Sequence, residues 1–568
     1  MSRKANIVSQ VGSWRLNLVR LVFISLVLGL AWRLADIQVL NSEFLRGQGD
    51  ARHLRDVTVP AHRGMILDRH DEPLAISTPV DSVWVNPQEI SIDDAKLEEL
   101  AQLLAIHISA VKKKIIANKT REFVYLKRRI SPELSEKVKQ LNIAGVALQR
   151  EYKRYYPAGE VTAHLIGFTN VDDKGQEGLE LTHNETLKGV PGLKRMMRDR
   201  YGRYVGGGEQ LEVTKAGEDI RLSIDLRLQY LSYQALKLAV NKYHAHSGSA
   251  VILDVETGEV LAMVNQPAFN PNNRRGLSAS DYRNRAVIDL FEPGSTVKPF
   301  TVATGLRSGK FTEASIIDTN PGHFRAGGHT IRDHRNLGEI NLATLIQKSS
   351  NVGSSKIALA LEPEELWQGF SSFGLGQPTG AYFPGEAMGS LPDLQSWGAF
   401  DRATLAFGYG MATSTLQLAR AYMVLANGGV LRPVSLMKTD DLPAGRRVFS
   451  SDTMKRILGM MESVALPGGT AEKAAVENYK VAGKTGTAKK ASVGGYSDAK
   501  YVSVFAGVIP ASKPRLAMVV MIDEPQGSVY YGGLVAAPVF SAVMTGAMRL
   551  LNIDPDNLPA SQLLVAKQ

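Results

Sequence analysis

Short apolar runs and longer helical patterns give the second half of the chain a definite order of elements. Five apolar runs bounded by turn residues predict strands, at residues 249–254, 260–264, 479–487, 501–509 and 516–522. The patterns at residues 225–241 and 538–551 indicate helices, and a largely helical middle spans about 293–461. Because two strands come early and three late, we expect one central antiparallel sheet of five strands, closed by distant segments and flanked by helices. The expected fold class is α+β.

The stretch from residue 40 to 218 has a different pattern and predicts a separate domain, followed by a second domain over 219–551 and a flexible C-terminal tail over 552–568. Charged helical patterns cover residues 92–116 and 131–141. Three short motifs lie in the first domain, at residues 63–69, 154–159 and 175–180. None of the three pairs a nucleophile with a base, so this domain is not expected to carry the chemistry.

The charged residues of these motifs have a structural and a functional interpretation. Glu177 and Glu180 could act as a pair of catalytic carboxylates, but an acidic turn flanked by glycines more often makes structural hydrogen bonds. Arg63, Asp68 and Arg69 are expected to form an internal ion-pair network rather than a binding site. We favour the structural interpretation for both sets.

An apolar segment near the N-terminus predicts a membrane anchor over residues 16–39. Four basic residues precede its uncharged core, which places the short tail of residues 1–15 in the cytoplasm and nearly all of the remaining chain on the far side of the membrane. A cleaved signal peptide is the alternative, because Gly29-Leu30-Ala31 has the small-x-small pattern of a cleavage site. We expect the anchor to be retained.

Composition narrows the chemistry. The 568 residues are 44% hydrophobic, which is ample for a large core, and no cysteine is present, which excludes disulfides and thiol nucleophiles. The formal charge of +10 is modest for this length, and no nucleic-acid motif accompanies it, so no nucleic-acid partner is expected.

The strongest chemical signal is the segment around Ser295. Pro293 and Gly294 predict a turn that begins a helix, and Ser295 and Lys298 would share one face of that helix because they are three residues apart. A serine hydroxyl becomes a good nucleophile when a neutral lysine accepts its proton, and burial beside a second cation keeps a lysine neutral. Pro299 fits the first helical turn, where a missing backbone N–H costs least.

A Ser-x-x-Lys pattern is weak by itself, since the chain contains four. Only Ser295 is followed at domain-scale distances by the single Ser-x-Asn, Ser349-Ser350-Asn351, and by the single Lys-Thr-Gly, Lys484-Thr485-Gly486. The three motifs in this order match the serine acyltransferases that recognise penicillin.

Each motif residue then receives an expected role. Ser295 would attack a carbonyl, Lys298 would accept its proton, and Ser349 would relay that proton to the leaving amine. Asn351 would hold Lys298 and the substrate amide. Lys484 would keep Lys298 neutral and attract a substrate carboxylate. The remaining expected substrate contacts are Thr485, Gly486, Thr487, Tyr409 and Tyr531. Glycine at 486 would let the substrate backbone approach the strand.

The backbone N–H groups of Ser295 and Thr487 would form the oxyanion hole. No cofactor and no metal are expected. His323, His329 and His334 lie in a glycine-rich loop, but they lack the ligand spacing of a metal site.

Taken together, these motifs resemble a class B penicillin-binding protein, and most of all the septal peptidoglycan D,D-transpeptidases of the FtsI type. The resemblance covers nearly the whole chain after about residue 20 and includes the stretch 531–540. It implies a non-catalytic pedestal domain over 40–218 and a periplasmic transpeptidase domain over 219–551. It implies stem peptides ending in D-Ala-D-Ala as acyl donors, a stem-peptide amine as acceptor, and inhibition by β-lactams at Ser295. It also implies an inner-membrane location and partnership with an FtsW-type glycan polymerase and other division proteins.

Three other interpretations stay open at this stage. A serine β-lactamase would share the three motifs, but it has no use for an anchor and a first domain of this size. A catalytically idle scaffold or β-lactam sensor conflicts with the intact motif residues. Within the same class, the protein would serve cell elongation or act as a condition-specific second copy of the division enzyme.

Overall fold

The computed structural model describes residues 13–90, 95–198, 204–492 and 495–558. Residues 1–12 and 559–568, which belong to the two predicted tails, lie outside the described residues. Contacts between residues divide the chain into two compact units. The first contains residues 1–61, 80–151 and 190–215, and the second contains residues 62–79, 152–189 and 216–568.

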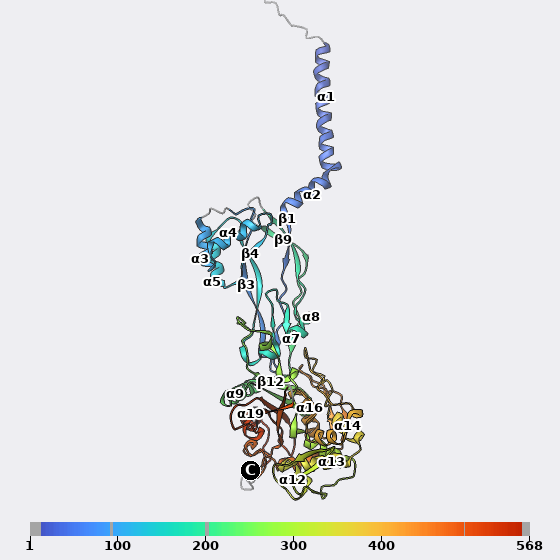
Figure 1. Cartoon of the computed structure of the whole chain (residues 1–568). Helices are drawn as coiled ribbons and strands as arrows, with labels where there is room; N and C mark the ends of the chain where they lie inside the picture. Colours follow the sequence, from blue (N-terminus) through green and yellow to red (C-terminus); the bar gives the residue numbers. More distant parts are fainter. Residues whose placement is uncertain (1–12, 91–94, 199–203, 493–494, 559–568) are drawn as a thin grey trace, which may run out of the picture. The chain divides into compact units, whose positions relative to one another are not determined.

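The first unit begins with the predicted anchor. Helix α1 (Ser13–Ala35) continues into a π-helical turn (Asp36–Leu40), and Figure 1 draws α1 as a single blue helix. The 28 residues Ser13–Leu40 have a window of mean hydropathy 2.0, and none of that window is buried. This helix is therefore long and apolar enough to cross a membrane. A short helix, α2 (Ser42–His53), follows.

The rest of the first unit combines strands with three helices on a small core of their own. Strands β1 (Leu54–Val59), β8 (Gly192–Arg198) and β9 (Tyr204–Glu212) form an antiparallel sheet. Strand β3 (Pro73–Val85) belongs to this unit from residue 80 on and β5 (Val146–Tyr155) up to residue 151; β3 pairs with β4 (Val124–Ile130) and with β5. The helices are α3 (Ala95–Leu103), α4 (Ile108–Ala117) and α5 (Pro132–Leu141). The predicted helix at 131–141 is confirmed, with Ser131 as its N-cap. Residues 92–94 of the pattern at 92–116 lie outside the described residues, and the rest of it gives two helices, because His107 caps a new one.

The second unit is built on the predicted central sheet, whose strands lie in the order β12-β11-β21-β20-β19, all antiparallel. Their bounds are β11 (Ser247–Asp254), β12 (Val260–Gln266), β19 (Ala482–Ser492), β20 (Gly495–Ile509) and β21 (Leu516–Asp523). All five predicted strands are confirmed. Strand β19, which carries Lys-Thr-Gly, is an edge strand of this sheet.

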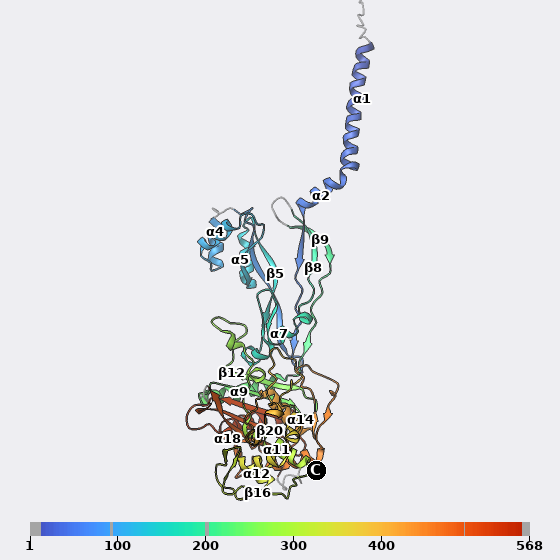
Figure 2. The same ribbon diagram turned by 45° about the vertical axis from the view of Figure 1, so that its right-hand side comes forward.

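Helices cover both faces of the sheet (Figures 1 and 2). Neighbouring residues of a strand point to opposite faces. A Cβ atom on Gly248 would meet Val240 and Leu236 of α9 (Leu226–Lys242), whereas the Ser249 hydroxyl is 2.7 Å from Thr415 of α16 (Thr415–Ala426). Helices α9 and α16 therefore lie on opposite faces. Helix α19 (Ala537–Leu550) packs beside α9 and contacts β20 through the Phe540 and Phe505 rings.

The predicted helices at 225–241 and 538–551 are confirmed as α9 and α19. The other longer helices of the unit are α11 (Lys298–Arg307), α12 (Leu342–Lys348), α13 (Asn351–Ala360), α14 (Pro363–Ser372), α15 (Ala399–Leu405) and α17 (Ser451–Glu462). Short helices are α6 (Ala163–Ile166), α7 (Gly178–Thr182), α8 (Asn184–Leu187), α10 (Arg285–Ile288) and α18 (Gly532–Val535).

Short strands complete the unit. They are β2 (Ile66–Leu67), β6 (Phe168–Thr169), β7 (Gly175–Glu177), β10 (Ile220–Arg221), β13 (Ile316–Asp318), β14 (His323–Ala326), β15 (His329–Arg332), β16 (Glu339–Asn341), β17 (Val430–Leu431) and β18 (Arg446–Arg447).

The charged motifs of residues 63–69 and 175–180 have structural partners in this unit. Glu180 is fully buried and lies 2.6 Å from both the Arg63 Nη2 and the Arg154 Nε atoms. The structural interpretation of Glu180 is thus confirmed. Arg63, Asp68 and Arg69 do not form the expected single network, because each of them contacts a different partner.

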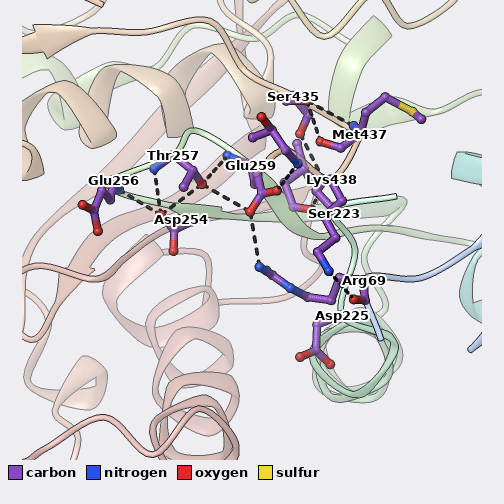
Figure 3. Close-up of polar contacts among 12 residues, drawn as sticks. Arg69, Ser223, Asp225, Asp254, Glu256, Thr257, Glu259, Ser435, Met437 and Lys438 are labelled. Atoms are coloured by element: carbon purple, nitrogen blue, oxygen red, sulfur yellow. Dashed lines mark hydrogen bonds and ion pairs between the residues drawn. The ribbon is translucent and has the colours of Figure 1, made fainter. Parts of the chain in front are cut away.

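Asp68 accepts the backbone N–H of Leu226 at the start of α9. Arg69 instead points to the buried Glu259, 3.3 Å away (Figure 3).

Candidate active site

Ser295 lies in a tightly supported turn directly before α11. The turn is a 3-10 helix (Gly294–Val297), and α11 begins at Lys298 with Pro299 in its first turn. The expected helix therefore starts with one 3-10 turn, and Ser295 stands in that turn. Gly294 has φ +54° and donates its N–H to the Gly408 carbonyl at 3.2 Å.

Two further contacts brace the turn. The buried Tyr422 hydroxyl, on α16, donates to the Thr296 carbonyl at 2.8 Å. Gly408 itself has φ +87°, and a Cβ atom there would lie 2.1 Å from the Gly294 carbonyl oxygen. Only glycine allows this approach of two backbone segments beside the nucleophile.

The three motifs meet around two buried lysines. Lys298 Nζ donates to Asn351 Oδ1 at 2.8 Å, to the Ser349 hydroxyl at 3.0 Å and to the Ser349 carbonyl at 2.5 Å. Lys484 Nζ donates to the same Ser349 hydroxyl at 2.9 Å. The structure thus brings Lys298, Ser349, Asn351 and Lys484 into one hydrogen-bonded cluster. Within the described part of the chain, this cluster leaves out the Ser295 hydroxyl.

Burial sets the charge of the two amines. Both lysine side chains are completely buried. Burial, and next the charge of Lys484, hold the pKa of Lys298 well below its usual range, although Asp333 acts in the opposite direction. Burial also lowers the pKa of Lys484 to about 7. The arrangement favours the neutral form of Lys298, which a general base requires.

Ser349 and Asn351 owe their positions to a break between two helices. Ser349 ends α12 in the left-handed conformation, with φ +63°, and α13 starts at Asn351. The Asn351 amide donates to the Arg332 carbonyl at 3.1 Å, which turns its oxygen toward Lys298. Asp333 accepts the Asn351 N–H at 2.5 Å. Asp333 was not predicted as a site residue, because only the fold brings this loop residue to Asn351.

A cavity of about 700 Å³ opens beside this cluster. Seven of the predicted site residues line it: Ser295, Ser349, Asn351, Tyr409, Thr485, Thr487 and Tyr531. Lys298, Lys484 and Gly486 lie behind its wall. The other lining residues are His334, Lys348, Thr470, Lys489, Tyr501, Tyr530, Gly532, Gly533 and Leu534. Tyr501, Tyr530 and Tyr531 stack in succession, with ring centroids 4.0 and 4.7 Å apart, and form one aromatic side.

The Lys-Thr-Gly strand presents its two threonines to the cavity. Thr485 donates its hydroxyl hydrogen to Thr470 at 3.0 Å, and the Thr487 hydroxyl accepts the Gly532 N–H at 3.0 Å. Glycine at 486 has a structural reason besides its predicted role toward substrate. A Cβ atom there would lie 2.7 Å from the Pro293 carbonyl oxygen, so glycine lets the nucleophile turn pack on β19.

The end of the cavity near Tyr409 is tied to the β19–β20 hairpin. The Tyr409 and Tyr496 rings meet edge to face, with centroids 5.4 Å apart. Glu292 accepts the Gly410 N–H at 2.8 Å and the Tyr496 hydroxyl at 2.9 Å, and burial raises its pKa. Glu292 therefore links the segment before Ser295 to this hairpin.

The histidine loop does not assemble a metal site. Among the described residues, no group of three or more His, Asp or Glu side chains could hold a metal ion. His329 packs on Phe400 and His334 lies against Tyr531.

Comparisons with known proteins agree with this geometry. Residues 248–545 match the family of the penicillin-binding protein transpeptidase domain, and residues 58–222 match the penicillin-binding protein dimerisation domain. The peptidoglycan D,D-transpeptidase FtsI of Escherichia coli (strain K12) is 46% identical over 96% of this chain and 93% of its own length. The probable peptidoglycan D,D-transpeptidase PbpC of Pseudomonas aeruginosa is 42% identical over 99% of both chains.

Solved structures extend the comparison to the fold. A peptidoglycan synthetase from Bifidobacterium adolescentis superposes with a TM-score of 0.71 at 27% identity, covering 89% of this chain and 98% of its own. The TP domain of penicillin-binding protein 3 from Burkholderia pseudomallei, solved without ligand, is 43% identical with a TM-score of 0.55, over 60% of this chain and 98% of its own. The chain belongs to the class B penicillin-binding proteins, in the group of the FtsI peptidoglycan D,D-transpeptidases.

Proposed function

We propose that this protein is a serine D,D-transpeptidase that cross-links peptidoglycan stem peptides during septal wall synthesis and is acylated by β-lactams. One observation carries the proposal. The buried cluster of Lys298, Ser349 and Lys484 lies at the wall of the same cavity that Ser295 and Asn351 line. A nucleophile, a base held neutral and a shared relay hydroxyl are the parts that acyl transfer needs.

The first step transfers the acyl group to the enzyme. Ser295 Oγ attacks the carbonyl of the penultimate D-Ala of the donor, and Lys298 accepts the hydroxyl proton. Ser349 then passes a proton from the lysine pair to the leaving amine of the terminal D-Ala as the C–N bond breaks. In the second step an amine of a neighbouring stem peptide attacks the acyl-enzyme, and Ser295 regains its proton.

The backbone N–H groups of Ser295 and Thr487 stabilise the oxyanion of both steps, at about 3–4 kcal/mol for a donor of this kind. The position of Thr487 on an edge strand supports this role, since half of such a strand's backbone N–H groups have no partner within the sheet.

Substrate binding is assigned to the side of the cavity formed by β19. Thr485 and Thr487 offer hydroxyls to the donor carboxylate, and Lys484 attracts it. Tyr409 and Tyr531 both line the same cavity and are the further proposed substrate contacts. Gly486 acts through the support of the nucleophile turn, as its contact with Pro293 indicates.

The apolar helix and the similar proteins support a proposed cellular location and proposed partners. We assign residues 16–39 to the inner membrane, residues 1–15 to the cytoplasm and the catalytic domain, 219–551, to the periplasm, with 40–218 as its pedestal. The basic residues before the apolar helix support this orientation. An FtsW-type glycan polymerase and other division proteins are the proposed partners.

Labelling with a fluorescent penicillin tests the proposal. A stable adduct on Ser295, located by peptide mass spectrometry and absent from Ser295→Ala, is expected. Ser308→Ala, at a half-buried hydroxyl after α11 that donates to the Gly305 carbonyl at 2.8 Å, is the control and should label like the unmodified chain. Rapid release of hydrolysed drug would instead favour a β-lactamase, and absence of any adduct on folded protein would favour a scaffold.

A further inference from the structure

The hairpin β14–β15 is a second support of the active site that the three motifs do not include. Its strands pair from His323–Arg332 to Ala326–His329. Ala326 and Ile331 of the hairpin pack with Ala403 and Phe407 of the α15 region in a small separate core. Arg332 is the last residue of β15 and Asp333 follows it directly, so the hairpin fixes both residues.

Asp333 makes an unusually complete set of contacts with the Ser-x-Asn turn. Its Oδ2 accepts the Ser350 hydroxyl at 2.6 Å, and its Oδ1 accepts the N–H groups of Asn351 at 2.5 Å and Val352 at 3.0 Å. Its own N–H donates to the Gly322 carbonyl at 2.9 Å, which holds the carboxylate in place. One side chain thus satisfies three donors at the start of α13, where such donors have no intrahelical partner.

These contacts determine the geometry at Lys298. Ser349 adopts a left-handed backbone that a residue other than glycine adopts only under tertiary restraint. The Ser349 carbonyl and hydroxyl and the Asn351 amide oxygen are the three acceptors of Lys298 Nζ. A turn that relaxed by a few tenths of an ångström would move all three acceptors together.

We infer that Asp333 is a positioning residue of the acyl-transfer reaction, which clamps the Ser349–Asn351 turn against Lys298 and adds one negative charge behind the two buried lysines. The inference rests on the proposed function, because it concerns the same base and nucleophile. The carboxylate does not touch the cavity and acts through the turn.

The charge of Asp333 has a measurable consequence. The groups that act on Lys298 are Lys484 from β19, which lowers its pKa, and Asp333, which raises it. His334 and Lys348 line the adjoining cavity, and the Lys348 ammonium is bound to the Gly468 carbonyl at 2.6 Å. Acylation requires neutral Lys298, so its rate rises with pH as Lys298 loses its proton. Removing the Asp333 charge lowers the pKa of Lys298. The increase of the acylation rate with pH should therefore occur at lower pH.

Two substitutions separate geometry from charge. Asp333→Asn keeps one oxygen for the two backbone N–H groups and removes the charge, whereas Asp333→Ala removes both. The second-order rate constant for penicillin acylation of the full chain is measured from pH 5 to 9. We expect Asp333→Ala to lower the plateau acylation rate by about 10-fold or more. The Asp333→Asn variant should keep most of the rate of the unmodified chain. In both variants the midpoint of the pH profile should move to lower pH.

Asp401→Asn is the matched control. Asp401 also caps a helix of this region, since it accepts the Gly398 N–H at 2.9 Å at the start of α15, but its side chain is exposed. It should leave plateau and midpoint unchanged. If folded Asp333→Ala kept the plateau acylation rate of the unmodified chain, the inference would be overturned. A lowered plateau rate with an unchanged midpoint of the pH profile would also overturn it, because Asp333 would then act only as a helix cap. Failure of the unmodified chain to label at Ser295 would refute the proposed function instead.

Discussion

At the scale of single residues, the active site depends on two amines that the fold buries around one hydroxyl. Lys484 is the clearer case for stability, since burial lowers its pKa from 10.5 to about 7. Between these pH values the unfolded chain binds a proton that the folded chain does not. The buried amine therefore lowers stability, increasingly as the pH falls from 10.5 to 7, and this loss is absent above 10.5.

Replacing Lys484 by Met separates this cost from function. The variant should unfold at no lower temperature than the unmodified chain at pH 7, and the difference in its favour should shrink as the pH rises toward 10. Its acylation rate should nevertheless fall strongly, because Ser349 loses a donor and Lys298 loses its neighbouring cation. Thermal unfolding and penicillin labelling at pH 7, 8.5 and 10 provide the comparison. Equal losses of folding and acylation would contradict the assigned role.

At the scale of elements, close backbone approach holds the nucleophile turn between α11, β19 and the turn at Gly408. The substitution Gly408→Ala should therefore cost more than about 2 kcal/mol, since it combines a positive φ with a contact of 2.1 Å to the Gly294 carbonyl. Labelling of Ser295 should slow in the fraction that remains folded. Urea unfolding and labelling rates measure the two effects.

Gly459 supplies the matched glycine. It lies inside α17 and a Cβ atom there would meet nothing within 4 Å, so Gly459→Ala should stabilise the protein by about 1 kcal/mol and leave labelling unchanged. Similar effects of both substitutions would mean that the approach at Gly408 does not position Ser295.

The same compact unit contains a buried ionic cluster away from the cavity. Glu180 separates two buried guanidinium groups, those of Arg63 and Arg154, by pairing with both. Glu180→Gln should lower the free energy of unfolding by about 3–5 kcal/mol, because it leaves two buried cations without a counter-charge. Urea unfolding measures the loss. The exposed surface pair of Glu133 and Lys137 is the control, and Glu133→Gln should leave the free energy of unfolding nearly unchanged.

At the scale of the whole molecule, the apolar helix should decide where the protein resides. A chain that begins at Asn41 lacks Ser13–Leu40, and we expect it to be released without detergent, whereas the full chain should sediment with membranes. Its penicillin labelling at Ser295 should be unchanged. Sedimentation of the shortened chain with membranes would show that another segment binds the bilayer.

Most elements of the second unit were predictable because their patterns are local. The five strands of the sheet are apolar runs with turn residues between them, and α9 and α19 have strong helical patterns. The helix break at His107 was missed, because the apolar pattern continues on both sides of it. The network expected of Arg63, Asp68 and Arg69 was only partly correct, because neighbouring residues of a loop can bond to different elements.

The sequence by itself determined the fold class, the apolar anchor and the chemistry, since Ser295, Lys298, Ser349, Asn351 and Lys484 stand in motifs whose order and spacing are specific. Tertiary structure alone decided how these residues meet. Asp333 reaches Asn351 through a hairpin, and Gly486 and Gly408 are glycines because other backbone lies against them. Such contacts join segments far apart in the chain, and no local pattern records them. The burial that makes two lysines weak bases is likewise a property of the packed core.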